Sequence, residues 1–197
     1  MREMILMVVV LTCLSAVSGG LLAAIRDNTK ERIEYQQLKF VKGPAIRAIL
    51  QGASNDPITD RFKITDGDVE RSFFVGVFDG KAQRVAFESA GKGYGGDVGL
   101  MIGVNLADDN ILGVGVTTHA ETPGLGSKAQ SDPAFVSQFK GLGAKETFGV
   151  KSDGGQIDAM SGATITSRAV CGGVTDAGKI YQKLKPQIAE QLKQYQK

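Results

Sequence analysis

The sequence has 197 residues and a formal net charge of +2, which suits one soluble domain with a short appendage. Its lysines and arginines are scattered and form no nucleic-acid-binding pattern, so we expect no nucleic-acid partner. Glycine is frequent, at 26 residues, and tryptophan is absent. This composition indicates many tight turns and close backbone approaches.

An uncharged stretch from Met4 to Ile25 lies near the start of the chain. It is long enough to cross a bilayer as a helix, which takes about 20 apolar residues. A cleaved signal peptide is the alternative, because small residues precede Gly19. The length of the apolar run, and the helical pattern directly after it, favour a retained transmembrane anchor over residues 1–25.

The charges that flank this stretch give a weak signal for its orientation. Only Arg2 precedes it, whereas Arg26, Lys30 and Arg32 follow it. Counting positive charges would place the body of the protein in the cytoplasm, but long domains are translocated largely regardless of such charges.

Residues 26–71 are expected to form a helical connecting region. Apolar and charged residues alternate at helical spacing from Arg26 to Gln51, with a break at Gly43-Pro44, and Asn55-Asp56-Pro57 predicts a turn.

Residues 72–197 are expected to form the main domain. A short helix is expected from Asp132-Pro133 to about Lys140, with a further strand at Thr147–Val150. Short turns between strands imply antiparallel pairing, so we predict an α+β fold: an antiparallel sheet with packed helices, preceded by one transmembrane helix. The predicted strands of this sheet are Ser72–Phe78, Ala82–Glu88, Asp97–Leu106 and Ile111–Thr118.

The glycine-rich stretch Gly91–Gly96 formally matches the dinucleotide-binding pattern GxGxxG. That pattern needs a helix to follow, so that the pyrophosphate lies on the helix N-terminus. The residues that follow here, Val98–Val104, are strand-like, so we exclude dinucleotide binding and expect a loop or a close-packed turn.

No metal site is predicted. Asp66, Asp68 and Glu70 have the spacing of cation ligands, but no complete calcium loop follows them, and a solvated strand end is expected instead. The two cysteines, Cys13 and Cys171, form no ligand motif, and Cys171 is expected to be a small core residue.

The segment His119–Gly126 follows a predicted strand and contains the only histidine of the sequence. Its Pro123-Gly124 pair predicts a tight turn. Without a second histidine or a nucleophile motif, His119 is expected to be a hydrogen-bonded structural residue rather than a catalytic base.

A second polar loop, Asp158–Ser167, gathers small and hydroxyl-bearing residues just before an apolar helical pattern. Gly162 and Ala163 leave room for a close approach to the backbone, and Thr164 is expected at the apex with a free hydroxyl.

The helix after this loop is expected to end at about Lys185, before Pro186, with Thr166 and Ser167 as its natural N-caps. Because a helix N-terminus carries unpaired N–H groups and partial positive charge, it is a ready phosphate site. A capped helix start without a ligand is the alternative interpretation.

The Asp-x-x-Ser-Gly-Ala-Thr sequence at Asp158–Thr164 resembles the flavinylation motif of the FMN-binding domain found in the G subunit of Rnf complexes and in the C subunit of sodium-pumping NADH:quinone oxidoreductases. Glu121–Gly126 resembles a segment that lines the flavin pocket in this family, and Gly93–Gly96 resembles a glycine-rich loop near the flavin. The resemblance covers roughly Ser72–Leu184 plus the anchor, and the chain looks more like the Rnf protein than the quinone-reductase one.

The resemblance implies that Thr164 carries FMN through a phosphoester bond. A dedicated flavin transferase would install it from FAD with Mg²⁺, and Asp158 opens the motif that this enzyme recognises. The other residues expected near the cofactor are Ser161, Gly162, Ala163, Thr166, Ser167, Glu121, Thr122, Leu125, Gly126 and Lys128. No catalytic residue is expected, because the flavin does the redox chemistry.

We therefore expect an electron-transfer flavoprotein subunit of an ion-translocating ferredoxin:NAD⁺ oxidoreductase. The resemblance places it in the inner membrane of a prokaryote, with a single span, the domain outside the cytoplasm, and the lipid bilayer and the other subunits of the complex as partners. It has no expected catalysis of its own. The alternatives are the C subunit of the quinone reductase and a membrane-anchored assembly module without a cofactor.

Overall fold

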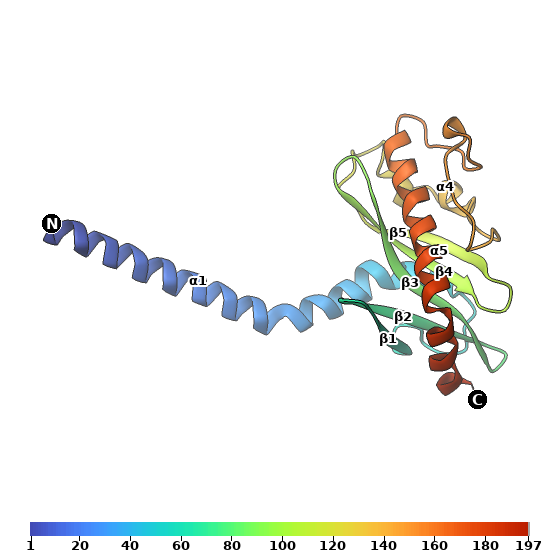
Figure 1. Cartoon of the computed structure of the whole chain (residues 1–197), viewed down its shortest axis with the longest axis horizontal. Helices are drawn as coiled ribbons and strands as arrows, with labels where there is room; N and C mark the ends of the chain where they lie inside the picture. The colour runs from blue at the N-terminus through green and yellow to red at the C-terminus, as the bar shows by residue number, and fades with distance from the viewer. Residues whose placement is uncertain (197) are drawn as a thin grey trace. The chain divides into compact units, whose positions relative to one another are not determined.

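The structure, a computed structural model, describes residues 1–196, and it divides into two units that meet between Lys39 and Phe40. Figure 1 shows the whole chain. In chain order the elements are α1 (Arg2–Gln36), η1 (Gln37–Lys42), α2 (Gly43–Ile49), β1 (Arg61–Asp66), β2 (Val69–Phe78), β3 (Lys81–Lys92), β4 (Asp97–Asn105), β5 (Asn110–Thr118), α3 (Lys128–Ser131), α4 (Pro133–Ser137), η2 (Lys151–Asp153), α5 (Thr164–Leu192) and η3 (Lys193–Tyr195).

The first unit consists mainly of helix α1, which has 35 residues and no buried side chain. By length and composition it could cross a membrane, as the sequence predicted. The predicted helix break at Gly43-Pro44 is wrong, since these residues begin α2 directly after the π-helical η1. Proline is tolerated in the first turn of a helix, where its missing N–H has no partner to lose.

The second unit contains a five-stranded antiparallel sheet in which every strand pairs with its neighbours in the chain, in the order β1-β2-β3-β4-β5. This confirms the predicted α+β class. Strand β1 lies in the region predicted to be a helical connector and was not expected. Its buried Phe62 and Ile64 alternate with exposed residues, which is the period of a half-buried strand.

Helix α5 lies across one face of the sheet, against β3 and β4 (Figure 1). Phe73, Phe87 and Leu100 point from the sheet into the core that includes Tyr181 of α5. Alternate strand residues face the opposite side, where Gly103 approaches Ile49 of α2. The sheet is therefore covered on both faces, by α5 on one and by α2 on the other.

Two small residues let the first half of α5 approach strand β3 closely. A Cβ on Gly91 would lie 1.8 Å from the carbonyl oxygen of Ala169, and a Cβ on Gly173 would lie 3.0 Å from the carbonyl carbon of Ala90. The hydroxyl of Ser89 donates a hydrogen bond to the Gly173 carbonyl at 2.8 Å. These contacts set the height of the helix above the sheet.

The predicted end of this helix near Lys185 is wrong, because α5 continues through Pro186 to Leu192. Proline removes one helical hydrogen bond and usually breaks or kinks a helix. Here Ile188 and Leu192 are buried beyond the proline, and this apolar burial favours continuing the helix.

Asp109 ties this second half of α5 to the turn between β4 and β5. Its carboxylate accepts a hydrogen bond from the Tyr181 hydroxyl at 2.6 Å and pairs with Lys185 and Lys145. Lys185, followed by Tyr181, holds the pKa of Asp109 well below its usual range. Burial, together with Asp109, raises the pKa of Tyr181.

Two smaller expectations have mixed outcomes. Cys171 is buried in the core, as predicted, and burial raises the pKa of its thiol to about 11. The strand predicted at Thr147–Val150 is absent among the described residues, where only an isolated bridge joins Val150 to Ile157.

Adjacent glycines in α5 allow a direct test of the close approach between helix and strand. Gly173→Ala should lower the free energy of unfolding by about 1–3 kcal/mol, because the new Cβ would lie 2.6 Å from Cδ1 of Leu100 and 3.0 Å from the carbonyl carbon of Ala90, so the helix or its neighbours would have to shift. Gly172→Ala is the matched control, since a Cβ added there would meet no atom within 4 Å, and it should raise that free energy by about 1 kcal/mol. Denaturant unfolding followed by circular dichroism measures both, and equal effects would contradict the packing described.

Candidate functional site

Helix α5 begins at Thr164, directly after Ala163, whose side chain cannot cap the helix. The prediction that Thr166 and Ser167 cap this helix is wrong, because both lie inside its first turn. Their hydroxyls are used elsewhere: Thr166 bonds Glu121, and Ser167 bonds the preceding loop. The helix N-terminus therefore lacks a side-chain cap and keeps its partial positive charge available to a ligand.

The loop before the helix is a tight turn from Met160 to Ala163, closed by a 3.0 Å hydrogen bond from the Ala163 N–H to the Met160 carbonyl. Gly162 holds the third position with φ of 75°. This position of such a turn strongly favours glycine, which adopts a positive φ without strain. Thr164, the first residue of α5, directly follows this turn.

Glu121 is buried, with only 5% of its surface exposed, at the centre of the site. One carboxylate oxygen accepts a hydrogen bond from the Thr166 hydroxyl, and the other accepts one from the Gly95 N–H at 2.8 Å. The N–H of Tyr94 is a further donor. Glu121 thus links the β3–β4 loop to the first turn of α5.

The hydrogen bonds decide the charge of this carboxyl. Burial alone would raise the pKa of Glu121, but the Thr166 hydroxyl and the N–H groups of Gly95 and Tyr94 outweigh burial and hold the pKa below its ordinary value. Glu121 is therefore ionised at neutral pH.

Glycines make room for this buried carboxylate on two sides. A Cβ on Gly93 would lie 2.5 Å from one carboxylate oxygen of Glu121. A Cβ on Gly126 would lie 2.6 Å from the Thr166 hydroxyl and 2.9 Å from the other carboxylate oxygen. The GxGxxG-like stretch therefore packs closely around an acidic side chain, and strand β4 follows it, as predicted, rather than a helix.

The loop after β5 has the predicted tight turn at Pro123-Gly124. The N–H of Leu125 donates to the Thr122 carbonyl at 3.2 Å, and Gly124 has φ of 74°. Nδ1 of His119 accepts a hydrogen bond from the N–H of Glu121 at 3.3 Å. This agrees with the structural role expected for the histidine.

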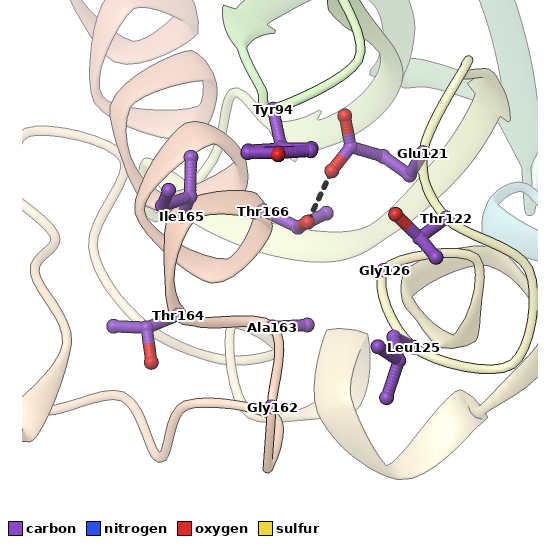
Figure 2. Close-up of a pocket in the computed structure, with 10 residues that line it drawn as sticks. All are labelled: Tyr94, Glu121, Thr122, Leu125, Gly126, Gly162, Ala163, Thr164, Ile165 and Thr166. Carbon is purple, nitrogen blue, oxygen red and sulfur yellow. Dashed lines mark hydrogen bonds between the residues drawn. The ribbon is translucent and has the colours of Figure 1, made fainter.

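The β3–β4 loop, the loop after β5 and the turn that leads into α5 border an open cavity of about 480 Å³. This volume is within the usual range for small-molecule sites. Figure 2 shows the labelled side chains around it, with the Thr166 hydroxyl directed at the Glu121 carboxylate and Tyr94 beside both. Tyr94 is 73% exposed, Ile165 48% and Leu125 45%, so apolar surface borders the opening.

The structure brings together most of the residues that the sequence pointed to, from segments about 40 positions apart. Those that line the cavity are Glu121, Thr122, Leu125, Gly126, Gly162, Ala163, Thr164 and Thr166.

In the described chain, Ser161, Ser167, Lys128 and Asp158 do not line the cavity. Ser161 and Lys128 are exposed, whereas Ser167 is buried behind the turn. Asp158 is exposed and pairs with Lys151 at 2.7 Å.

Two lining residues were not named as cofactor contacts in the sequence analysis: Ile165, and Tyr94, whose loop was nevertheless expected near the flavin. Tyr94 had a signal, because it lies in the Gly93–Gly96 stretch that resembles a loop near the flavin. Ile165 had a weaker signal. It directly follows Thr164, but the apolar residues of this helix were expected to pack into the core.

The arrangement suits a ligand that combines an anionic group with a flat aromatic one. An anion would lie at the start of α5, beside the Thr164 hydroxyl, where uncapped N–H groups and the helix dipole stabilise negative charge. An aromatic ring would find apolar contacts at Tyr94, Leu125 and Ile165. The residues present therefore fit a phosphorylated flavin.

Comparisons with known proteins give the same answer. Residues 93–179 match the family described as the FMN-binding domain. A solved structure of the C subunit of Na⁺-translocating NADH-quinone reductase from Parabacteroides distasonis shares the fold, with a TM-score of 0.55 and 24% identity over 82% of this chain and 96% of that chain.

The curated relatives extend over most of the chain. The G subunit of the ion-translocating oxidoreductase complex of Pseudomonas aeruginosa (strain UCBPP-PA14) is 35% identical over 182 residues, which are 86% of this chain and 84% of the relative. The corresponding G subunit of Methanosarcina acetivorans is 32% identical over 86% of this chain and 89% of the relative. The chain therefore belongs to the family of G subunits of ion-translocating oxidoreductase complexes, the Rnf complexes.

Proposed function

We propose that this protein is the electron-transfer flavoprotein subunit of an ion-translocating ferredoxin:NAD⁺ oxidoreductase, and that it carries FMN through a phosphoester on Thr164. The observation that carries the proposal is the position of Thr164, which is both the first residue of α5 and part of the cavity wall. A phosphate esterified there lies at a helix N-terminus, where negative charge is stabilised.

Bound FMN would supply the redox chemistry, and the chain would bind and orient it. The uncapped first turn of α5 would stabilise the phosphate. Leu125 would form an apolar wall and Thr122 would donate a hydrogen bond, while the Tyr94 ring would cover the flavin from the glycine-rich loop. The ionised Glu121, just behind these groups, would set the local electrostatic potential.

The partners follow from the same assignment. The relatives are subunits of an oxidoreductase complex, so other subunits of such a complex would exchange electrons with this one. A flavin transferase would load Thr164 during maturation, and the exposed Asp158 is accessible for recognition by that enzyme. Na⁺ or H⁺ movement would belong to the whole complex, because α1 carries no charged residue from Met4 to Ile25.

Residues 1–25 would anchor the protein in the inner membrane of a prokaryote, with the lipid bilayer around α1 and the domain of residues 72–197 outside the cytoplasm. The length and apolar character of α1 support the anchor. An ester would retain the cofactor in a compartment where free FMN is scarce.

The C subunit of the quinone reductase is the second candidate, favoured by the shared fold of its solved structures. The long matches to Rnf G subunits weigh against it. A membrane-anchored assembly module without a flavin is a weaker alternative, and the visible spectrum of the purified protein separates it from a flavoprotein.

The first test is the mass of the protein purified from its native membrane. It should exceed the sequence mass by one FMN less one water, and the excess should lie on the tryptic peptide that contains Thr164. Thr164→Ala should abolish the excess. An unmodified native protein, or modification that survives Thr164→Ala, would overturn the proposal.

A second test concerns the charge of Glu121. In Glu121→Gln the amide oxygen keeps one acceptor for the Gly95 N–H, and the amide N–H₂ can donate to the Thr166 hydroxyl, so the site should stay assembled. Removal of a negative charge beside the flavin should raise its reduction potential by on the order of 30 mV, or about 1.4 kcal/mol for a two-electron couple.

Potentiometric titration measures this shift. Glu190→Gln is the control, because it removes an exposed carboxylate near the far end of α5. An unchanged potential in Glu121→Gln would show that this charge does not act on the flavin. Failed loading would show that the carboxylate is needed earlier, to assemble the site.

A third test addresses the membrane orientation. Alkaline phosphatase fused to the C-terminus should be active, because this enzyme folds only outside the cytoplasm, whereas a fused cytoplasmic reporter should be silent. The opposite pattern would place the domain in the cytoplasm, as the positive-charge count suggests. N-terminal sequencing that begins near Gly19 would show cleavage rather than anchoring.

A further inference from the structure

The side chain of Ser167 braces the turn that precedes Thr164. Its hydroxyl accepts a hydrogen bond from the Met160 N–H at 3.0 Å and donates one to the Ala163 carbonyl at 3.0 Å. These are the first and last residues of the turn. Ser167 is fully buried, with 0% exposure, and does not line the cavity.

The brace adds to bonds that already close the turn. The Ala163 N–H bonds the Met160 carbonyl, and the Ser167 N–H bonds the Ala163 carbonyl at 2.9 Å. The Ser167 hydroxyl therefore joins both ends of the turn to the first turn of α5. Since Thr164 follows Ala163 directly, the same hydrogen bonds also fix the position of the Thr164 backbone.

We propose that Ser167 is a positioning residue that presents the Thr164 hydroxyl for flavin transfer, rather than a residue that contacts the flavin. This inference rests on the proposed attachment of FMN to Thr164. In that step Thr164 Oγ forms a bond to the flavin-side phosphorus of FAD and the pyrophosphate P–O bond breaks. AMP leaves, and the hydroxyl proton is released to the transferase or solvent.

Preorganised geometry matters for such a step, because the attacking atom must be held close to its target and in line with the leaving group. A turn that fluctuates would present Thr164 correctly only part of the time. The transferase would still recognise the chain, since Asp158 is exposed and is held separately by Gln138, which bonds both its N–H and its carbonyl. Loss of the brace should therefore slow transfer without weakening recognition.

Helix α5 contains a matched control. Two turns after Ser167, the Thr175 hydroxyl donates to the Cys171 carbonyl at 2.9 Å and accepts a hydrogen bond from the Phe148 N–H at 2.9 Å. It makes the same pair of bonds, to the carbonyl four residues earlier and to a loop N–H, but this loop does not precede Thr164. Ser167→Ala and Thr175→Val each remove one such hydroxyl.

The experiment uses the full-length protein in detergent, purified transferase, FAD and Mg²⁺, and follows the covalent mass increase with time. Ser167→Ala should lower kcat for loading by about 10- to 100-fold, in the range expected for misplaced reacting groups, with an unchanged KM for the protein substrate. Thr175→Val should load like the unmodified protein. Amide hydrogen exchange in the peptide that spans the turn should become faster in Ser167→Ala only.

Equal loading rates in Ser167→Ala and the unmodified protein would overturn the inference, and so would a raised KM with unchanged kcat. Equal slowing in Thr175→Val would assign the effect to general stability and also overturn it. If Ser167→Ala does not fold, Ser167→Cys provides the same comparison, because a thiol forms weaker hydrogen bonds than a hydroxyl. Failure of the unmodified protein to load at Thr164 would instead contradict the proposed function.

Discussion

The buried carboxylate of Glu121 is the interaction on which the site depends. It accepts hydrogen bonds from the glycine-rich loop after β3 and from the first turn of α5, and it belongs to the loop after β5. An ionised carboxylate bonds such donors more strongly than a neutral acceptor does. Because the carboxylate is almost fully buried, each donor that it lost would leave an uncompensated charge. Glu121 therefore links all three segments that border the cavity.

The sheet affects the site indirectly, because it determines how closely α5 packs against the strands. Gly91 and Gly173 let the backbone of this helix lie close against the backbone of β3. Asp109, in the turn between β4 and β5, bonds Tyr181 and so holds the second half of the helix. Since α5 is a rigid element, its packing against the strand determines where Thr164 lies relative to Glu121. Residues far from the cavity thus fix the geometry of its wall.

Much of the fold and the site could be predicted because local signals were strong. The Pro123-Gly124 turn was predictable because proline fixes its own φ and glycine accepts a positive φ, whereas the Asp158–Thr164 site was predictable from its resemblance to the flavinylation motif. The end of α5 could not be predicted, because the penalty of Pro186 is local, whereas the burial of Ile188 beyond it depends on tertiary contacts. The bracing role of Ser167 was hidden for the same reason: a hydroxyl near a helix start indicates a cap, and only the folded loop shows its partners.

The openness of the cavity has a consequence for how a cofactor is kept there. With Tyr94, Ile165 and Leu125 all substantially exposed, the walls cover a flavin ring only partly, and a freely diffusing flavin would be held weakly. An ester at Thr164 would make ring binding an intramolecular event, and short tethers provide effective concentrations on the order of millimolar. Modest contacts then suffice to keep the ring docked. Such a pocket would leave one side of an esterified cofactor accessible to a redox partner without risk of losing it.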